Sequence, residues 1–150
     1  MLQTAACIVE NIIGGFGVSM SNEINVDFGE GKKLTARTAS FSIDSDQPVQ
    51  EGGGGTAPTP QDLFLSSLAM CAGHYARIFC ESKTISMNGM GLKIKYEMSE
   101  DGRQIKRFLY ELTLPEGFPE KYKAAILRAV DLCPIKKQLM NPPAFELEII

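Results

Sequence analysis

The segment TPQDLFLSSLAMCAGHYARIFCES, residues 59–82, decides the fold of this chain. Thr59 offers a hydroxyl N-cap, Pro60 suits the first helical position, and Asp62 favours the positive end of the helix dipole. Apolar residues then recur at helical spacing: Phe64, Leu68, Cys71, Tyr75 and Ile78. The pattern predicts a long helix to about Ser82 that is buried on most sides.

The sequence before this helix predicts strands and then a loop. Residues 3–43 contain short β-prone runs separated by Gly-rich turns, and the alternation in KLTARTASFSID, residues 33–44, is typical of a strand. Residues 45–59 lose this periodicity and are rich in Gly and Pro, which predicts a long loop. Loops of this length are often functional or mobile.

The sequence after the helix predicts a hairpin, a second helix and a last strand. GLKIKYEMS (91–99) and QIKRFLYELTL (104–114) alternate and flank EDGR, which carries the Asp-Gly hairpin signal. Residues 119–132 have helical periodicity, CPIKKQLM follows as a helical turn, and AFELEII (144–150) is strand-like. The order predicts an α+β fold with mostly antiparallel strands around a long buried central helix.

Length and charge restrict the class of protein. A chain of 150 residues suits one domain, here 1–150, and 15 basic against 18 acidic residues without blocks suggest neither a nucleic-acid nor a membrane partner. The N-terminus lacks the basic start of a signal peptide, and the apolar runs look too short to span a bilayer. We therefore expect a cytoplasmic protein, whose four cysteines are free, catalytic or redox-active rather than structural.

The central helix carries two cysteines and the only histidine. Cys71 and Cys80 lie nine residues apart, about 13 Å along the axis, which excludes a disulfide between them if the helix is real. Cys71 and His74 are neighbours on one face, but further metal ligands at a recognisable spacing are missing, so a structural histidine is favoured over a metal site. Taken alone, Cys71 is more typical of inert core than of a nucleophile.

Cys133 has a different setting. Pro134 suits the first position of a helix, so the thiol is expected near a helix N-terminus, where partial positive charge stabilises a thiolate. Lys136 and Lys137 add to that charge. The residues by themselves thus favour Cys133 as the more acidic thiol and leave a purely structural role open.

Two segments resemble the OsmC/Ohr family: GTAPTPQDLFLSSLAMC at 55–71 and AVDLCPIKKQL at 129–139. The resemblance implies an OsmC-like fold and a cytoplasmic, intertwined homodimer. It further implies a thiol peroxidase that reduces organic hydroperoxides, with Cys71 as the peroxidatic and Cys133 as the resolving cysteine. A small-molecule hydroperoxide and an external dithiol reductant are the implied partners, and neither a cofactor nor a metal is expected. Cys7 and Cys80 fit neither role and are interpreted as packing residues.

The sequence also departs from the family pattern. Strong peroxidases of the family place a Glu at the start of the central helix to anchor an Arg beside the thiol, and Gln61 stands at that position. The candidate cations Lys32, Lys33 and Arg37 do not match the Arg clearly, and Glu51 is more typical of a solvated loop charge than of a displaced carboxylate. The alternative is therefore an OsmC-like small-molecule-binding protein with little or no peroxidase activity.

Overall fold

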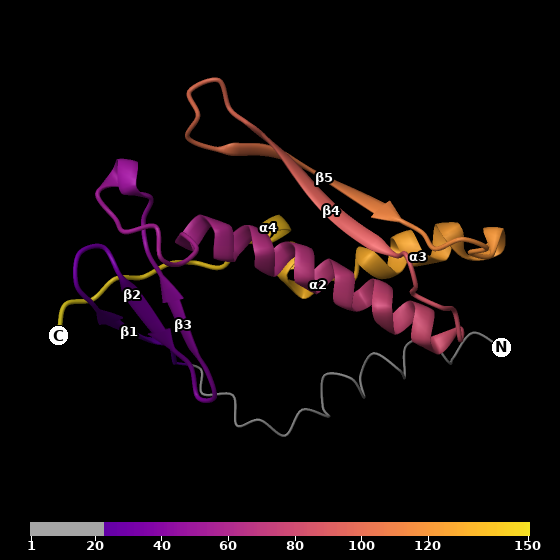
Figure 1. Cartoon of the computed structure of the whole chain (residues 1–150), viewed down its shortest axis with the longest axis horizontal. Coiled ribbons are helices and arrows are strands. Elements are labelled where there is room, and N and C mark those ends of the chain that lie inside the picture. The colour runs from indigo at the N-terminus through magenta and orange to yellow at the C-terminus, as the bar shows by residue number, and fades with distance from the viewer. Residues whose placement is uncertain (1–22) are drawn as a thin grey trace. The chain divides into compact units, whose positions relative to one another are not determined.

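The structure is a computed structural model that describes residues 23–150. Cys7 and the strands expected before residue 23 lie outside the described residues. The chain divides into two compact units, Met1–Pro60 and Gln61–Ile150, which are described here separately (Figure 1). Helices and antiparallel strands are both present, which confirms the α+β class.

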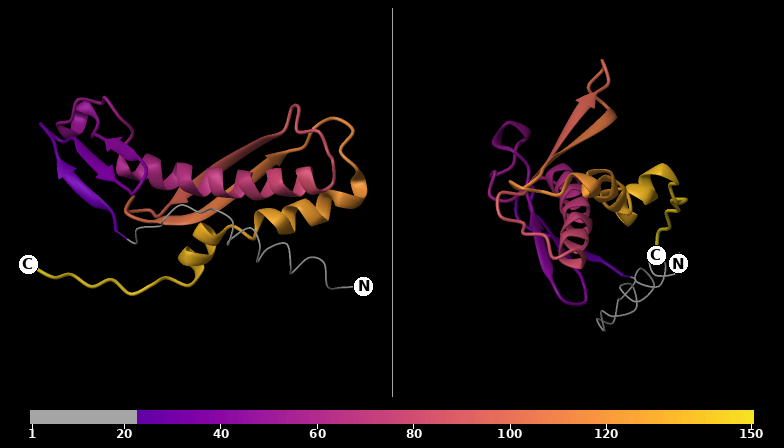
Figure 2. Two further views of the ribbon diagram at one scale, coloured as in Figure 1. Left: turned by 90° about the horizontal axis from the view of Figure 1, so that it is seen from below. Right: turned by 90° about the vertical axis from the view of Figure 1, so that its right-hand side faces the viewer.

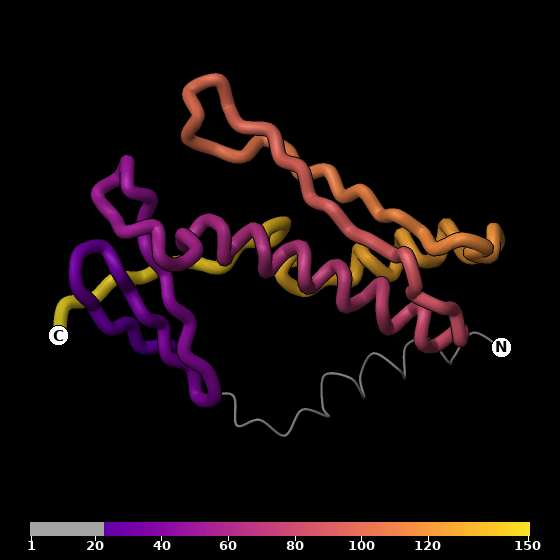
Figure 3. Tube along the Cα trace, viewed as in Figure 1, coloured from indigo at the N-terminus to yellow at the C-terminus, as the bar shows by residue number. Residues whose placement is uncertain are grey.

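The first unit holds a three-stranded antiparallel sheet, β1 (Asn25–Phe28), β2 (Leu34–Arg37) and β3 (Ser42–Ser45), in the order β1-β2-β3 (Figure 3). The sequence predicted a single strand over 33–44, and this was wrong. The chain turns back at Thr38, whose amide donates to the Phe41 carbonyl and whose hydroxyl accepts the amides of Ser40 and Phe41. Such local threonine bonds compete with a continued strand, so the segment forms a hairpin.

The Gly-rich loop after β3 is ordered around one carboxylate. Asp46 is only 1% exposed and accepts the amides of Gln47, Gly54 and Thr56 and the Thr56 hydroxyl, at 2.8 to 3.1 Å. The loop also contains a short 3-10 helix, η1 (Val49–Glu51). Gly53 is needed here because a Cβ on it would lie 1.9 Å from the Gln47 carbonyl oxygen. The predicted loop is confirmed and has a defined structure.

Helix α2 (Pro60–Ser82) begins and ends where the sequence predicted. Its fully buried residues follow one line at i, i+4, i+8 and i+12: Leu68, Ala72, Ala76 and Cys80. Burial on most sides is not found, since Met70 on another face is exposed, and so is Phe64, one turn before Leu68 on the same line. The apolar residues of α2 therefore extend further round the helix than the part that the described residues bury.

Helix α2 is also long and apolar enough to cross a bilayer by length and composition alone, so the expectation that every apolar run is too short was wrong. One helix of this kind is weak support for a membrane span, because the core helix of a soluble protein passes the same test. The buried line of α2 belongs to such a core.

The predicted hairpin is confirmed as β4 (Gly91–Met98) and β5 (Ile105–Thr113), which pair antiparallel. Beyond it lie η2 (Glu120–Tyr122), α3 (Lys123–Val130) and α4 (Pro134–Met140), which match the predicted second helix and helical turn. The hairpin and α3 lie along α2 in both orientations (Figures 1 and 2). Ile126 and Val130 of α3, together with Leu92 and Leu112 of the hairpin, pack on the buried line of α2.

The predicted last strand, 144–150, is not formed in the structure. Its alternating apolar residues Phe145, Leu147 and Ile149 are all at least 88% exposed. A strand needs a partner for its backbone groups, and this segment has none among the described residues.

Candidate functional site

The second unit brings the side chains of Cys71 and Cys133 together. Cys71 lies in the middle of α2, and Cys133 directly precedes α4. The two residues are 62 positions apart in sequence, but their thiols are neighbours, because Cys133 is one of the groups that raise the pKa of Cys71. Both are free thiols. The Ile135 amide lowers the pKa of Cys71, so the first turn of α4 also lies near that thiol.

The Cys71 thiol is held in its protonated form. Burial is the main cause that raises its pKa to about 11, and the neighbouring Cys133 adds to the effect, in part through charge repulsion. The Ile135 amide acts in the opposite direction and only partly offsets these causes. In this setting the thiol needs an added positive charge or a high pH to ionise.

Cys133 is the N-cap of α4, as the sequence predicted from Pro134. Its sulfur accepts the Lys136 amide at 3.4 Å, and Pro134 occupies the first turn. The side chain is 1% exposed. A buried sulfur at this position satisfies an amide that the helix itself leaves unpaired.

Two tyrosines flank the thiol pair. Tyr75 lies one turn after Cys71 on α2, and Tyr110 comes from β5. The pKa of each phenol is raised, first by burial and then by the negative charge that the two cysteines acquire on ionisation. The phenols are therefore protonated at neutral pH.

A cavity of about 210 Å³ opens beside Cys133. Its wall includes an ion pair between the Lys136 ammonium and the Asp131 carboxylate, and the ammonium lies 6.0 Å from the centre of the Tyr110 ring. The residues that line the cavity are Tyr110, Leu127, Val130, Asp131, Cys133 and Lys136.

Sequence reasoning missed Tyr75, Tyr110 and Asp131 as neighbours of the thiols. Tyr75 carried a signal, because it lies four residues after Cys71 on the predicted helix. Tyr110 and Asp131 carried none, since their closeness depends on how the hairpin and α3 pack on α2.

The remaining residues of the central helix do not join this site. Cys80 is fully buried in the core and contacts the Met90 sulfur at 3.9 Å, which confirms its packing role. His74 is exposed and packs edge-on against Tyr75. Gln61 is exposed and lies ten residues before Cys71, about 15 Å along the helix.

The candidate cations and Glu51 all belong to the first unit. Arg37 forms an ion pair with Asp27 and a hydrogen bond to Ser42 at 3.2 Å, so its guanidinium is engaged within the sheet. Lys32, Lys33 and Glu51 are exposed. Among residues 23–150, no cluster of three His, Cys, Asp or Glu side chains is arranged to hold a metal ion.

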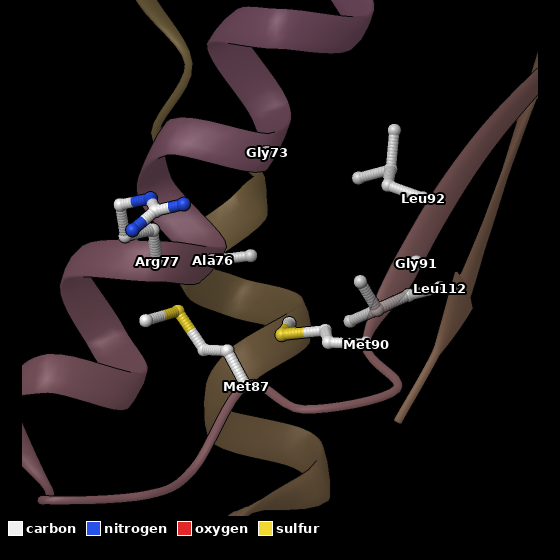
Figure 4. Close-up of a pocket in the computed structure, with 8 residues that line it drawn as sticks. All are labelled: Gly73, Ala76, Arg77, Met87, Met90, Gly91, Leu92 and Leu112. Atoms are coloured by element: carbon white, nitrogen blue, oxygen red, sulfur yellow. The ribbon is translucent and has the colours of Figure 1, made fainter. Parts of the chain in front are cut away.

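A second cavity, of about 200 Å³, lies between α2 and the start of β4 (Figure 4). Met87, Met90, Leu92 and Leu112 form its apolar walls, and the Arg77 guanidinium lies at its edge. Its α2 residues, Gly73, Ala76 and Arg77, are two, five and six positions from Cys71, which places them on the opposite side of the helix from that thiol.

The model of the OsmC-like protein family matches residues 52–148, and the chain belongs to this family. An OsmC-like protein from Mycoplasma pneumoniae has a similar structure, with 21% sequence identity and a TM-score of 0.65 over 83% of this chain and 91% of that one. An organic hydroperoxide resistance protein OsmC from Legionella pneumophila is 18% identical, with a TM-score of 0.51 over 78% and 88% of the two chains. At these identities the likeness shows the fold alone. No curated protein sequence matches the chain.

Proposed function

We propose that this protein is a thiol peroxidase that reduces organic hydroperoxides through Cys71 and Cys133. Membership of the OsmC-like family, together with structural neighbours named for organic hydroperoxide resistance, supports a redox or peroxidase-related role. The closeness of the two thiols carries the proposal: Cys133 raises the pKa of Cys71, so the two side chains are neighbours, and a sulfenic acid formed on one sulfur would have the other nearby.

The chemistry proceeds in three steps. The Cys71 thiolate attacks an oxygen of the hydroperoxide, so that an S–O bond forms, the O–O bond breaks and an alcohol leaves after taking up a proton. The Cys133 thiolate then attacks the sulfenic sulfur, which forms the disulfide and expels hydroxide, and this hydroxide takes up a proton from solvent to give water. An external dithiol finally reduces this disulfide and is itself oxidised.

The high pKa of Cys71 limits the first step. With a pKa of about 11, only about one thiol in ten thousand is ionised at pH 7. Gln61 cannot anchor an arginine by charge, which fits weak or altered activity. The rate of hydroperoxide consumption is therefore expected to rise about tenfold per pH unit between pH 7 and 10.

The test compares cumene hydroperoxide or tert-butyl hydroperoxide with hydrogen peroxide. One equivalent of organic hydroperoxide is expected to consume two thiols and to leave a peptide linked through Cys71 and Cys133. Cys71→Ala should abolish turnover, Cys133→Ala should stop at the sulfenic acid, and Cys80→Ala is the matched control. Turnover that survives Cys71→Ala, or a link to Cys80, would contradict the proposal.

A second candidate function is the binding of a small molecule without turnover. The cavity of Figure 4 favours it, because it is apolar, has one cationic residue at its edge and lies away from the thiols. Such a site suits a small apolar anion. Octanoate binding, measured by calorimetry, should be lost in Gly73→Leu, which fills the cavity, and kept in Gly73→Ala, whose added Cβ meets nothing within 4 Å.

The oligomeric state, the cytoplasmic location, the dithiol reductant and the assignment of 1–150 as a single domain stay predictions. The apolar surface that α2 leaves uncovered supports the homodimer.

A further inference from the structure

The cavity beside Cys133 contains a cation that the family resemblance did not indicate. Lys136 lies on α4, three residues after Cys133, and its side chain is only 34% exposed. Its ammonium is held from one side by Asp131, and the Tyr110 ring lies 6.0 Å from it on the cavity wall. The adjacent Lys137 is exposed and does not line this cavity. The two lysines therefore differ in environment although they are neighbours in sequence.

The groups around the Cys133 sulfur make this cation distinctive. Cys71 and Tyr75 come from α2, and Tyr110 comes from β5. Each of these groups is neutral when protonated and negative when deprotonated, so none supplies a positive charge. Asp131 precedes the sulfur in the chain and is negative. Among the described residues that line the cavity, only Lys136 carries a positive charge.

We infer that Lys136, anchored by Asp131, is a positioning residue whose ammonium stabilises the Cys133 thiolate when it forms, because both side chains line the same cavity. This inference rests on the proposed redox role of the cysteine pair. The same thiolate serves twice. It attacks the Cys71 sulfenic acid, forming the S–S bond and expelling hydroxide, and it is the leaving group when an external thiolate attacks Cys71 in the disulfide.

The direction of the reductive step follows from access and leaving-group ability. Cys71 is partly exposed, whereas Cys133 is 1% exposed, so an external thiolate reaches Cys71 more readily. A thiolate that is stabilised by a nearby ammonium also leaves faster than the buried Cys71 thiolate would. Lys136 therefore favours attack of the reductant on Cys71, with the Cys133 thiolate as the leaving group.

The test measures the pH midpoint of Cys133 alkylation by iodoacetamide in reduced protein that carries Cys71→Ser, with the modified peptide quantified by mass spectrometry. Lys136→Gln is expected to raise this midpoint by about one pH unit and to slow alkylation at pH 7 about tenfold. Lys136→Arg should restore the midpoint, because it keeps the charge. Lys137→Gln, with the same charge change on the next residue, should leave it unchanged.

Three outcomes would overturn the inference: no shift in Lys136→Gln, equal shifts in both glutamine variants, or a failure of Lys136→Arg to restore the midpoint. A kinetic measurement with Cys71 intact separates this inference from the proposed function. After one equivalent of cumene hydroperoxide, Lys136→Gln should slow disulfide closure about tenfold relative to Lys137→Gln. If the unaltered protein does not react with the hydroperoxide, the proposed function fails, while the alkylation midpoints still decide the role of Lys136.

Discussion

Asp46 shows how one side chain orders a loop that composition alone would describe as irregular. Its carboxylate accepts three amides and one hydroxyl, and the Thr56 and Gln47 amides are the main causes that lower its pKa from 3.8 to about 2. A carboxyl group with a lowered pKa in the folded state stabilises that state above the pKa of the unfolded chain. This contribution is lost as the pH falls from about 4 to about 2.

Asp46→Asn should therefore loosen the loop at neutral pH and remove the acid-dependent part of its stability. An amide presents only one oxygen, and its NH₂ group cannot accept the loop amides. Faster hydrogen exchange of the Gly54 and Thr56 amides, with less change between pH 4 and 2 than in the unaltered protein, is the expected result. Gln50→Ala, an exposed residue of the same loop that is not among the partners of the carboxylate, is the control, and equal exchange in both variants would contradict this role of Asp46.

The thiol pair makes a second prediction at this scale. Because Cys133 is, after burial, the second cause that raises the pKa of Cys71, Cys133→Ala should lower that pKa below about 11, while the larger rise caused by burial remains. Alkylation of Cys71 then becomes faster at pH 8, by up to about tenfold for each unit of pKa lost. The pH profile of Cys71 alkylation measures this, with Cys80→Ala as control. An alkylation midpoint that stays at about pH 11 in Cys133→Ala would show that Cys133 does not contribute to the raised pKa of Cys71.

At the scale of elements, helix α2 is followed by a residue whose backbone conformation is strained. Thr84 has a φ of +54°, while the Ile85 amide donates to the Cys80 carbonyl and the Thr84 amide to the Glu81 carbonyl. This is the bonding of a Schellman cap, in which glycine is the usual residue at the left-handed position. A β-branched residue with positive φ is disfavoured by contacts of its Cβ.

Thr84→Gly should therefore stabilise the protein by about 0.5 to 1 kcal/mol, the strain relieved minus the entropy that glycine costs in the unfolded chain. The free energy of unfolding in urea measures it. Thr84→Ala keeps the Cβ and should give little gain. A loss of stability in Thr84→Gly would show that Thr84 makes a contact that outweighs its backbone strain.

Periodicity predicted the elements of the second unit well. The limits of α2 followed from Pro60 and the apolar spacing, and the β4–β5 hairpin from its Asp-Gly turn. The failed predictions at 33–44 and 144–150 have a common cause, since alternation shows only a preference for a strand. At 33–44 the hydrogen bonds of Thr38 turn the chain back, and at 144–150 a pairing strand is missing among the described residues. The contact between Cys71 and Cys133 depends on packing and came only from the resemblance.

For the whole molecule, the exposed apolar residues point to assembly. We predict a homodimer whose interface buries more than about 2,000 Å² in total and includes residues 144–150. Leu147→Lys should weaken dimerisation at least about tenfold, because it removes one buried leucine per copy, whereas Glu148→Lys alters the opposite side of the same segment and should have little effect. Light scattering across a dilution series measures this, and a monomeric mass of the unaltered protein at micromolar concentration would refute it.

The closeness of Cys71 and Cys133 also bears on how long the protein survives in excess oxidant. A sulfenic acid that must wait for its partner is exposed to a second peroxide molecule and to irreversible conversion into sulfinic acid. Here the partner thiol is a neighbour of Cys71 in the reduced protein, so disulfide closure is expected to compete with that damage. For the proposed peroxidase activity we therefore expect slow inactivation by repeated peroxide pulses, measured as the turnover that remains after each pulse.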